Sequence, residues 1–137
     1  MLASLTIYFE NAAGRLLEHP DGYVVFRYYA GKRKFIDLQA LFVHTRNLLQ
    51  RNNWHRLLGD QRLMAPFTPE ESAWIVSYWL DGTHQRPGGL YGAVLLANDV
   101  FARLSMGQVM HEANASALTY RLFDNEVEAV SWLLQAA

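Results

Sequence analysis

The segment Trp54–Leu80, WHRLLGDQRLMAPFTPEESAWIVSYWL, decides the fold of this chain. A short apolar strand stops at Gly59-Asp60, and a compact loop follows over 61–67. The sequence Thr68-Pro69-Glu70-Glu71 then has the signature of a helix start, with a Thr cap, Pro at the first helical position and Glu three residues after the cap. We therefore predict a strand–loop–helix unit that places polar groups at the carboxyl end of the strand, where open α/β sheets have their sites.

The residues before this unit predict an antiparallel meander followed by a helix. Three short strands are expected over 5–9, 15–18 and 23–29. The turns between them contain Asn and Gly in one case and Pro-Asp-Gly in the other, and these residues favour tight turns. Apolar residues then recur at helical spacing between Phe35 and Leu49, and the helix is expected to end at 51–53.

The residues after this unit alternate between strands and helices. We expect the second helix to end at Asp81-Gly82 and a loop to follow over 84–89. The remaining elements are a buried strand over 91–97, a helix capped by Asn98-Asp99, a strand over 118–123 and a final helix capped by Asp124. Short connections between alternating strands and helices require a mostly parallel sheet. The sequence therefore predicts one α/β domain over 1–137, with a mixed sheet, the antiparallel meander at one edge, and helices packed on it.

Composition excludes several classes of function. The chain has 137 residues, 51% hydrophobic and only 18% charged, with a formal net charge of −1. We expect no nucleic-acid partner, because nothing in this balance attracts a polyanion. Cysteine is absent, so disulfides and Cys-ligated zinc are excluded. The first residues do not predict a signal peptide and no apolar run is long enough to span a bilayer, so we expect a cytoplasmic protein without a membrane segment.

Three segments of this chain resemble the SpoIIAA-like family. They are the aromatic strand and Gly of Tyr23–Gly31, the segment Leu57–Ile75, and the ending YRLFDNEVEAVSWLL over Tyr120–Leu134. That family is related to the STAS anti-anti-sigma domains and has been grouped with CRAL-TRIO lipid-binding proteins. The resemblance implies a SpoIIAA-like sandwich over nearly the whole chain.

The chain departs from the anti-anti-sigma members at one informative place. Those members carry a phosphorylatable Ser after a central strand, whereas this chain has no Ser or Thr between Gly59 and Phe67. Thr68 is better explained as a helix cap, because its hydroxyl is then already bonded to the backbone. The resemblance therefore implies a fold more than a function, and a phosphorylation switch is not expected.

Asp60 and Arg62 lie at the carboxyl end of the predicted strand, and Asp99 follows the next strand. Two carboxylates beside an Arg could bind a polar ligand or act in acid–base chemistry. Alternatively, Asp60 and Arg62 bond to each other or to the backbone, and Asp99 caps its helix. We favour the second interpretation, because the sequence offers no further catalytic partner.

The other polar motifs predict neither a metal site nor a phosphate loop. The five histidines are His19, His44, His55, His84 and His111, and His111-Glu112 lacks the second His of an H-E-x-x-H motif. Lys32-Arg33-Lys34 stands before the first helix, where cations and backbone N–H groups could hold a phosphate. A solvated turn is the simpler interpretation. We expect no metal, no cofactor and no catalytic residues.

The second helix is unusually aromatic. Trp74 and Tyr78, with Phe67 before them, are expected along one face, while Ile75 and Trp79 lie on the adjacent face. Two large apolar faces exceed what a one-sided surface helix needs. They either fill the core or form an interface or pocket wall, where Trp and Tyr are favoured. The candidate ligand or interface residues are Asp60, Arg62, Met64, Phe67, Trp74, Tyr78 and Trp79.

These observations leave three functions open. The first is a non-enzymatic interaction or regulatory module that forms a homodimer or binds a protein partner through the second helix and the loop 81–89. The second is a carrier or sensor of an apolar small molecule or lipid. The third, which we favour least, is an enzyme that uses Asp60, Arg62 and Asp99.

Overall fold

The computed structural model describes residues 5–80, 89–112 and 118–136. The strands are β1 (Thr6–Asn11), β2 (Gly14–His19), β3 (Tyr23–Tyr28), β4 (Arg56–Asp60), β5 (Leu90–Leu95) and β6 (Leu118–Phe123). The helices are α1 (Phe35–Asn52), α2 (Pro69–Ile75), the π-helical turn η1 (Val76–Leu80), α3 (Val100–Glu112) and α4 (Glu126–Gln135). None of the helices in these described ranges has the length and apolar character that crossing a membrane requires.

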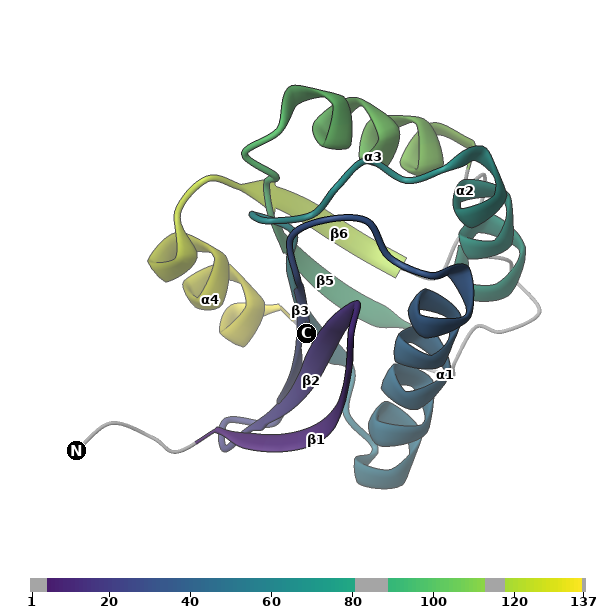
Figure 1. The fold of residues 1–137 in the computed structure, drawn as a ribbon. Coiled ribbons are helices and arrows are strands. Elements are labelled where there is room, and N and C mark those ends of the chain that lie inside the picture. The colour runs from purple at the N-terminus through teal and green to yellow at the C-terminus, as the bar shows by residue number, and fades with distance from the viewer. Residues whose placement is uncertain (1–4, 81–88, 113–117, 137) are drawn as a thin grey trace.

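The strands form one mixed sheet in the order β1-β2-β3-β4-β5-β6 (Figure 1). β1, β2 and β3 pair antiparallel, and β3 to β6 pair parallel. The register of the central pair runs from Arg56 opposite Tyr91 to Asp60 opposite Leu95. The predicted mixed sheet with its antiparallel edge is thus confirmed, because β4 and β5 run side by side in the same direction.

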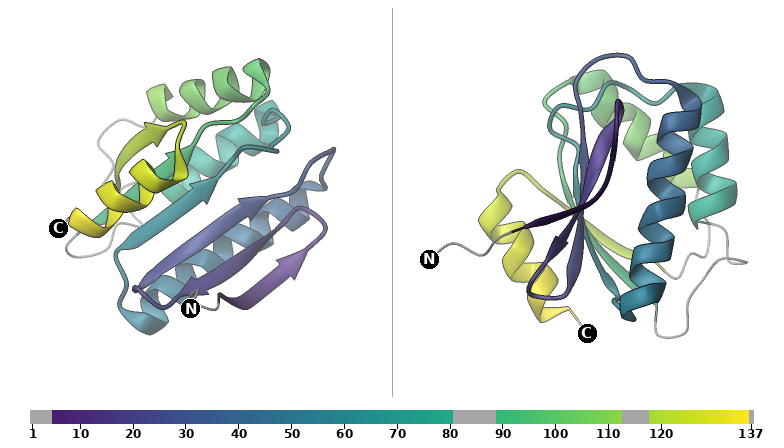
Figure 2. Two further views of the ribbon diagram at one scale, coloured as in Figure 1. Left: turned by 90° about the vertical axis from the view of Figure 1, so that its left-hand side faces the viewer. Right: turned by 60° about the horizontal axis from the view of Figure 1, so that its bottom comes forward.

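Helices cover both faces of the sheet. α1, α2 and α3 lie on one face, and α4 lies on the other (Figures 1 and 2). The core under the first three helices contains Phe26, Leu41 and Val109, and the core under α4 contains Leu58, Leu95 and Leu133. Leu57 packs against the first core and Leu58 lies in the second, since successive side chains of a strand point to opposite faces. β4 therefore contributes to both cores.

The helix ends follow local rules. Thr68 caps α2 as predicted, and Glu71 completes the capping box by accepting a hydrogen bond from the Thr68 backbone. Asn53 ends α1 in the left-handed conformation with φ 53°. The predicted cap of α4 was wrong by one residue, because the side chain of Asn125, rather than Asp124, accepts the bond from the Glu128 backbone at 3.0 Å. A cap must stand three residues before that N–H group, and Asn125 does.

The second helix is not one regular helix. α2 ends at Ile75 and continues as the π-helical turn η1, which carries Tyr78 and Trp79. The predicted end at Asp81-Gly82 and most of the predicted loop 84–89 lie outside the described residues. π-Helical turns occur frequently at functional sites, and Trp79 of η1 lines a cavity.

Candidate functional site

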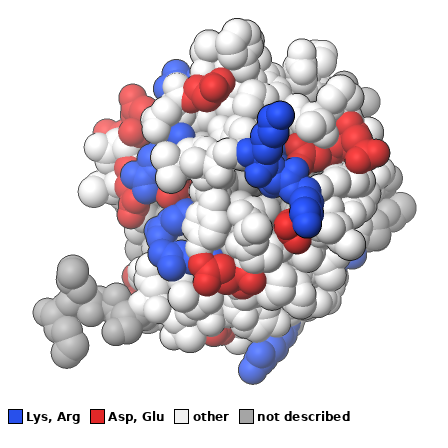
Figure 3. All heavy atoms as spheres, viewed as in Figure 1, with Lys and Arg blue, Asp and Glu red and all other residues white. Residues whose placement is uncertain are grey.

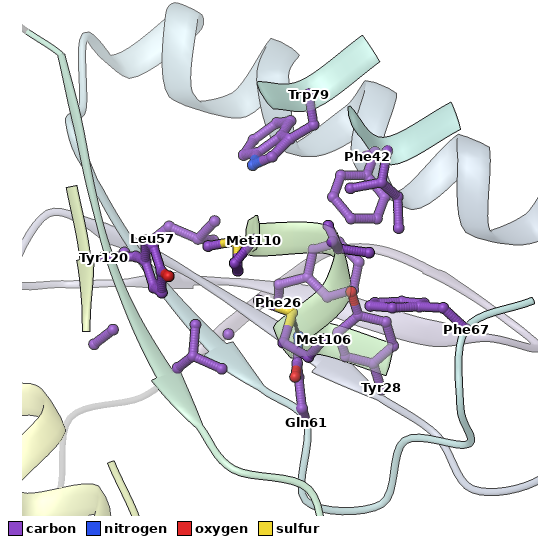
Figure 4. Close-up of a pocket in the computed structure, with 16 residues that line it drawn as sticks. Phe26, Tyr28, Phe42, Leu57, Gln61, Phe67, Trp79, Met106, Met110 and Tyr120 are labelled. Carbon is purple, nitrogen blue, oxygen red and sulfur yellow. Dashed lines mark hydrogen bonds between the residues drawn. The ribbon is translucent and has the colours of Figure 1, made fainter. Parts of the chain in front are cut away.

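A cavity of about 70 Å³ lies between the sheet and the helices α1, α2–η1 and α3 (Figure 4). Its walls come from the middle of the sheet and from all three of these helical elements. Its sixteen lining residues are Phe26, Tyr28, Phe42, Leu57, Gly59, Gln61, Phe67, Ile75, Trp79, Gly92, Ala93, Val94, Met106, Val109, Met110 and Tyr120. No Asp, Glu, Lys, Arg or His is among them, so the cavity suits an apolar occupant.

Two of the predicted aromatic candidates line this cavity. Trp79 lies beside Phe42 at one side, and Phe67 lies beside Tyr28 at another (Figure 4). The rings of Phe42 and Trp79 are 5.3 Å apart, and those of Tyr28 and Phe67 are 6.2 Å apart. Aromatic pairs at these separations hold one another in place. Part of the cavity wall is therefore rigid.

Glycine leaves room on the sheet side of the cavity. Gly59 of β4 and Gly92 of β5 both line it, and each would otherwise direct a side chain toward the helices. A Cβ atom built on Gly59 would come no nearer than 3.9 Å to any other atom outside its chain neighbours. The space above Gly59 is therefore open, and side chains at this position would occupy part of it.

A single amide enters this apolar space. Gln61 is only 5% exposed, and its Nε2 donates a hydrogen bond to the Met106 sulfur at 3.2 Å. Burial raises the pKa of the Tyr28 hydroxyl, which also belongs to a residue lining the cavity, so this hydroxyl stays protonated. A thioether is a weak acceptor. The Gln61 amide could therefore exchange this bond for one to a polar atom of a ligand.

Two methionines separate the cavity from a larger groove. Met106 and Met110, four residues apart on α3, line the cavity and also an open groove of about 440 Å³ between α3, the edge strand β6 and the residues that follow β5. Methionine is unbranched and adapts its shape easily. This wall can therefore rearrange more readily than the aromatic one.

Trp74 and Tyr78 belong to a separate aromatic stack. Their rings lie 4.5 Å apart and almost parallel, as their predicted common face requires, and the Arg46 guanidinium lies 3.8 Å from the Tyr78 ring centre. The prediction that Phe67 shares this face was wrong. Phe67 precedes the helix, where the extended loop turns its ring toward Tyr28 instead. The stack packs against Phe42 from outside the cavity.

Met64 is buried in the core beneath α1–α3 and is not a cavity residue. Its backbone N–H donates to the Gln61 carbonyl at 3.0 Å, which closes a turn directly after β4. Met64 therefore anchors the loop that carries Gln61 and Phe67, and the structure gives it no direct role at the candidate site.

Asp60 and Arg62 lie on the opposite face of the sheet. The Arg62 guanidinium donates to both Asp60 carboxylate oxygens, at 3.0 and 2.8 Å, and to Glu126 of α4 at 3.0 Å. Arg27 Nε donates to Asp60 at 3.3 Å. Burial by itself raises the pKa of the Asp60 carboxyl, but the bonds from Arg62 and the charges of Arg62 and Arg27 outweigh it, so the pKa lies below its ordinary value. This network joins β3, β4 and α4.

Asp99 does not join that network. Its carboxylate accepts bonds from the backbone N–H groups of Phe101 and Ala102, at 2.7 and 3.1 Å, and so caps α3. The carboxylate of Asp60 likewise accepts hydrogen bonds from Arg27 and Arg62. The structure therefore uses these carboxylates to hold the fold, and it does not bring them together as an acid–base pair.

The second residue of the basic segment Lys32–Lys34 is not solvated as predicted. Arg33 is buried and forms a two-bond ion pair with Glu71, with both distances 2.9 Å. It also donates to the carbonyl oxygens of Ala65 and Pro66. The predicted role of Glu71 in the capping box is confirmed. Its second role, the ion pair with Arg33, could not be predicted from local spacing, because Arg33 lies 38 positions earlier.

Two histidines stack on aromatic rings, and His55 Nδ1 lies 3.0 Å from the Gly89 carbonyl oxygen. His44 stacks on Phe9 with 4.0 Å between ring centres, and His19 stacks on Tyr23 at 4.2 Å. Within residues 5–80, 89–112 and 118–136, no group of three or more His, Asp or Glu side chains is arranged to hold a metal ion. His84 lies outside these ranges.

Sequence reasoning missed most of the cavity. Gln61, Met106 and Met110 were not among the candidates, although the spacing of the two methionines with Val109 marks the face of α3 that turns to the sheet. Gly59 had been treated only as the end of a strand. A glycine inside an apolar strand is a sequence signal for close approach or open space, and it could have indicated the cavity.

The resemblance to the SpoIIAA-like family stays a prediction. The structure supports the coarser statement, an α/β fold with a six-stranded mixed sheet and helices on both faces. Comparisons of this chain with protein-family models, with curated proteins and with solved structures found no match.

Proposed function

We propose that this protein is a non-enzymatic binding module that holds a small apolar molecule in the cavity between the sheet and the helices α1, α2–η1 and α3. One observation carries the proposal: a cavity lined by sixteen residues of which none is acidic, basic or His. Apolar lining with one amide, that of Gln61, is the arrangement expected for an apolar ligand that carries at most one polar group. This is the carrier or sensor function that the aromatic second helix had suggested.

The local structure supports this proposal in two further ways. The π-helical turn η1 carries Trp79 to the cavity, and a regular α-helix would have placed this ring differently. The open space above Gly59 could be filled by a single methyl group at little steric cost, yet it remains open. Both features favour a space that is kept for an occupant.

Benzene is a suitable first probe, because it is apolar and small. A ligand that binds the folded state raises the unfolding temperature by an amount set by its concentration and affinity. We expect benzene to raise the midpoint of thermal unfolding of the wild type and to have no such effect on Gly59→Val, whose side chain enters the cavity. Thr119→Val, which places the same residue type at an exposed position of β6, is the control and should respond like the wild type. Equal responses of Gly59→Val and wild type would overturn the proposal.

A second candidate function is self-association, and a surface on α3 favours it. Val100, Phe101 and Leu104 are large apolar residues with about 60% of their surface exposed, Phe101 the most at 66%. Leu63, in the loop beside the start of α3, is also exposed, and the Arg62 carbonyl in that loop accepts a bond from Asn98. In Figure 3 the upper part of the molecule, where α3 lies in Figure 1, is largely white, so few charged side chains reach it.

A second copy of the chain is the occupant we propose for this α3 surface. A symmetric dimer places the same patch of both subunits in contact, and an apolar patch without like charges is compatible with itself. Light scattering after size exclusion should therefore show a dimer for the wild type and a monomer for Phe101→Asp. Ile36→Asp, at an equally exposed site on α1, is the control and should remain dimeric. A wild-type monomer at every concentration would exclude this function.

A further inference from the structure

We propose that the ligand is a single-chain amphiphile, with the end of its apolar tail in the cavity and its carboxylate head in the outer groove beside Arg103. This inference rests on the proposed function, since it uses the same cavity. It adds a second, charged subsite and thereby names the chemical class of the ligand. The two spaces, their shared wall and the charges in the groove lead to it.

The cavity and the outer groove share four of their lining residues, Gln61, Met106, Met110 and Tyr120. The boundary between the two spaces is therefore built from side chains, and two of the four are methionines with freely rotating chains. In Figure 4, Met106 lies beside Gln61, and Met110 lies near Tyr120 and Leu57. A narrow alkyl chain could pass this boundary after a change of methionine rotamers, and at about 70 Å³ the cavity would take the end of the chain while the rest lies in the 440 Å³ groove.

The two spaces differ in charge. The cavity is lined by no Asp, Glu, Lys, Arg or His, whereas Arg103 and His111 of α3 line the groove. None of the described residues that line either space is acidic. An ionised group inside the cavity would lose its hydration without compensation, so it has to stay in the groove. A ligand that fits both spaces thus has an apolar end and an anionic end.

Arg103 has donors to offer such a head group. Its Nε donates to the Ala97 carbonyl at 2.5 Å, which fixes the side chain at the groove. Among the described residues, no carboxylate forms an ion pair with Arg103, in contrast to Arg27, Arg33 and Arg62. The guanidinium keeps two terminal nitrogens, and their planar arrangement matches the two oxygens of a carboxylate.

Decanoate and 1-decanol distinguish this inference from the proposed function, because they have the same chain length and differ in head group. Calorimetric titration at neutral pH, below micelle-forming concentrations, should show that decanoate binds the wild type more tightly than 1-decanol. Arg103→Gln should weaken decanoate binding about tenfold, as expected for a lost charge-assisted bond pair, and leave 1-decanol binding unchanged. Arg51→Gln, on the exposed side of α1, is the matched control and should bind both like the wild type.

Each outcome has a defined meaning. If both compounds bind equally well and Arg103→Gln changes neither, the head subsite is wrong while the apolar cavity stands. If neither compound binds, or if Gly59→Val binds both like the wild type, the cavity is not the tail site, and the inference falls. Even if the inference falls in this way, the proposed function stands as long as benzene raises the unfolding temperature of the wild type and not that of Gly59→Val.

Anionic phospholipid vesicles separate a free ligand from a membrane surface. If the protein sediments with such vesicles through Arg103, and Gly59→Val sediments equally, Arg103 meets a lipid surface without a chain in the cavity. That result would overturn the inference. We expect instead that neither the wild type nor Gly59→Val sediments with vesicles.

Discussion

Two glycines of the sheet differ in what a methyl group would meet. At Gly14, a Cβ atom would lie 2.4 Å from the backbone oxygen of Arg27, a contact that the antiparallel pair β2–β3 cannot relieve without moving. At Gly59 the nearest atoms lie at 3.9 Å, in ordinary van der Waals contact. The sheet therefore requires glycine at position 14. At position 59 a larger residue would meet no steric clash at its Cβ atom.

We expect opposite effects of alanine at these two positions. Gly14→Ala should lower the free energy of unfolding by about 2 kcal/mol, because backbone must shift to admit the methyl group. Gly59→Ala should raise it by about 0.5 kcal/mol, since alanine restricts the unfolded chain and fits without strain. Urea unfolding with an unchanged slope measures both. A destabilised Gly59→Ala would mean that the space above Gly59 is smaller than the structure shows.

Asp60 makes stability depend on pH. Its pKa is depressed in the folded state, mainly by Arg62 and Arg27, which outweigh the effect of burial. A depressed pKa contributes stability that is fully present above the ordinary value of about 4 and is lost as the pH falls through the folded value. The groups facing Asp60 are Arg27, Arg62 and, through Arg62, Glu126.

Asp60→Asn should therefore lower the free energy of unfolding at pH 7 by about 2 kcal/mol, through loss of the charged bonds. As the pH falls below 4 and through the depressed pKa of Asp60, the difference between the variant and the wild type should shrink, because the wild-type carboxyl then takes up a proton and loses its charge. Urea unfolding at a series of pH values measures the difference. A difference that stays constant down to pH 2 would show that the charge of Asp60 is not responsible.

At the scale of elements, α2 depends on two separable interactions. Thr68 and Glu71 form the capping box, and Glu71 also pairs with the buried Arg33. The pair ties the start of α2 to the segment between β3 and α1. Because both side chains are at most 5% exposed, removing one charge leaves the other in an apolar surrounding.

Glu71→Gln keeps an oxygen for the capping box but removes the charge. We expect it to lower the free energy of unfolding by about 3 kcal/mol, whereas Thr68→Ala should cost only about 1 kcal/mol, the usual effect of a lost cap. Chemical denaturation of both variants gives the comparison. Equal losses would mean that Arg33 contributes little beyond the cap.

At the scale of the whole molecule, the sheet joins two cores that are formed by different helices. Among the helices that the structure describes, α4 alone covers the face opposite to the cavity, with Leu133 fully buried and its neighbour Leu134 at 39% exposure. Since β2, β3 and β4 contribute side chains to both cores, the loss of one core should weaken the other. We therefore expect a single cooperative unit.

Leu133→Ala should lower the free energy of unfolding by about 3 kcal/mol, and Leu134→Ala by less than about 1 kcal/mol. In both variants, tryptophan fluorescence and far-ultraviolet circular dichroism should follow the same transition, as a single cooperative domain requires. Separate transitions for the two signals in Leu133→Ala would show that α4 unfolds on its own and that the two cores are independent.

The sequence by itself determined the features that depend on near neighbours. The cap at Thr68, the left-handed end of α1 at Asn53 and the stack of Trp74 on Tyr78 all involve residues within one helical turn, so their spacing is enough. Alternation of strands and helices after β3 likewise determined the parallel part of the sheet, because short connections leave no other arrangement.

Only the tertiary structure decided which residues form the site. The cavity is bounded by Phe26, Gly59, Trp79 and Met106, which come from β3, β4, η1 and α3 and meet only when helices pack on the sheet. The partner of Glu71 was equally hidden, 38 positions away. Periodicity tells which face of an element is apolar, but it does not tell whether that face is filled by its neighbours, and the space they leave depends on the shapes of all of them at once.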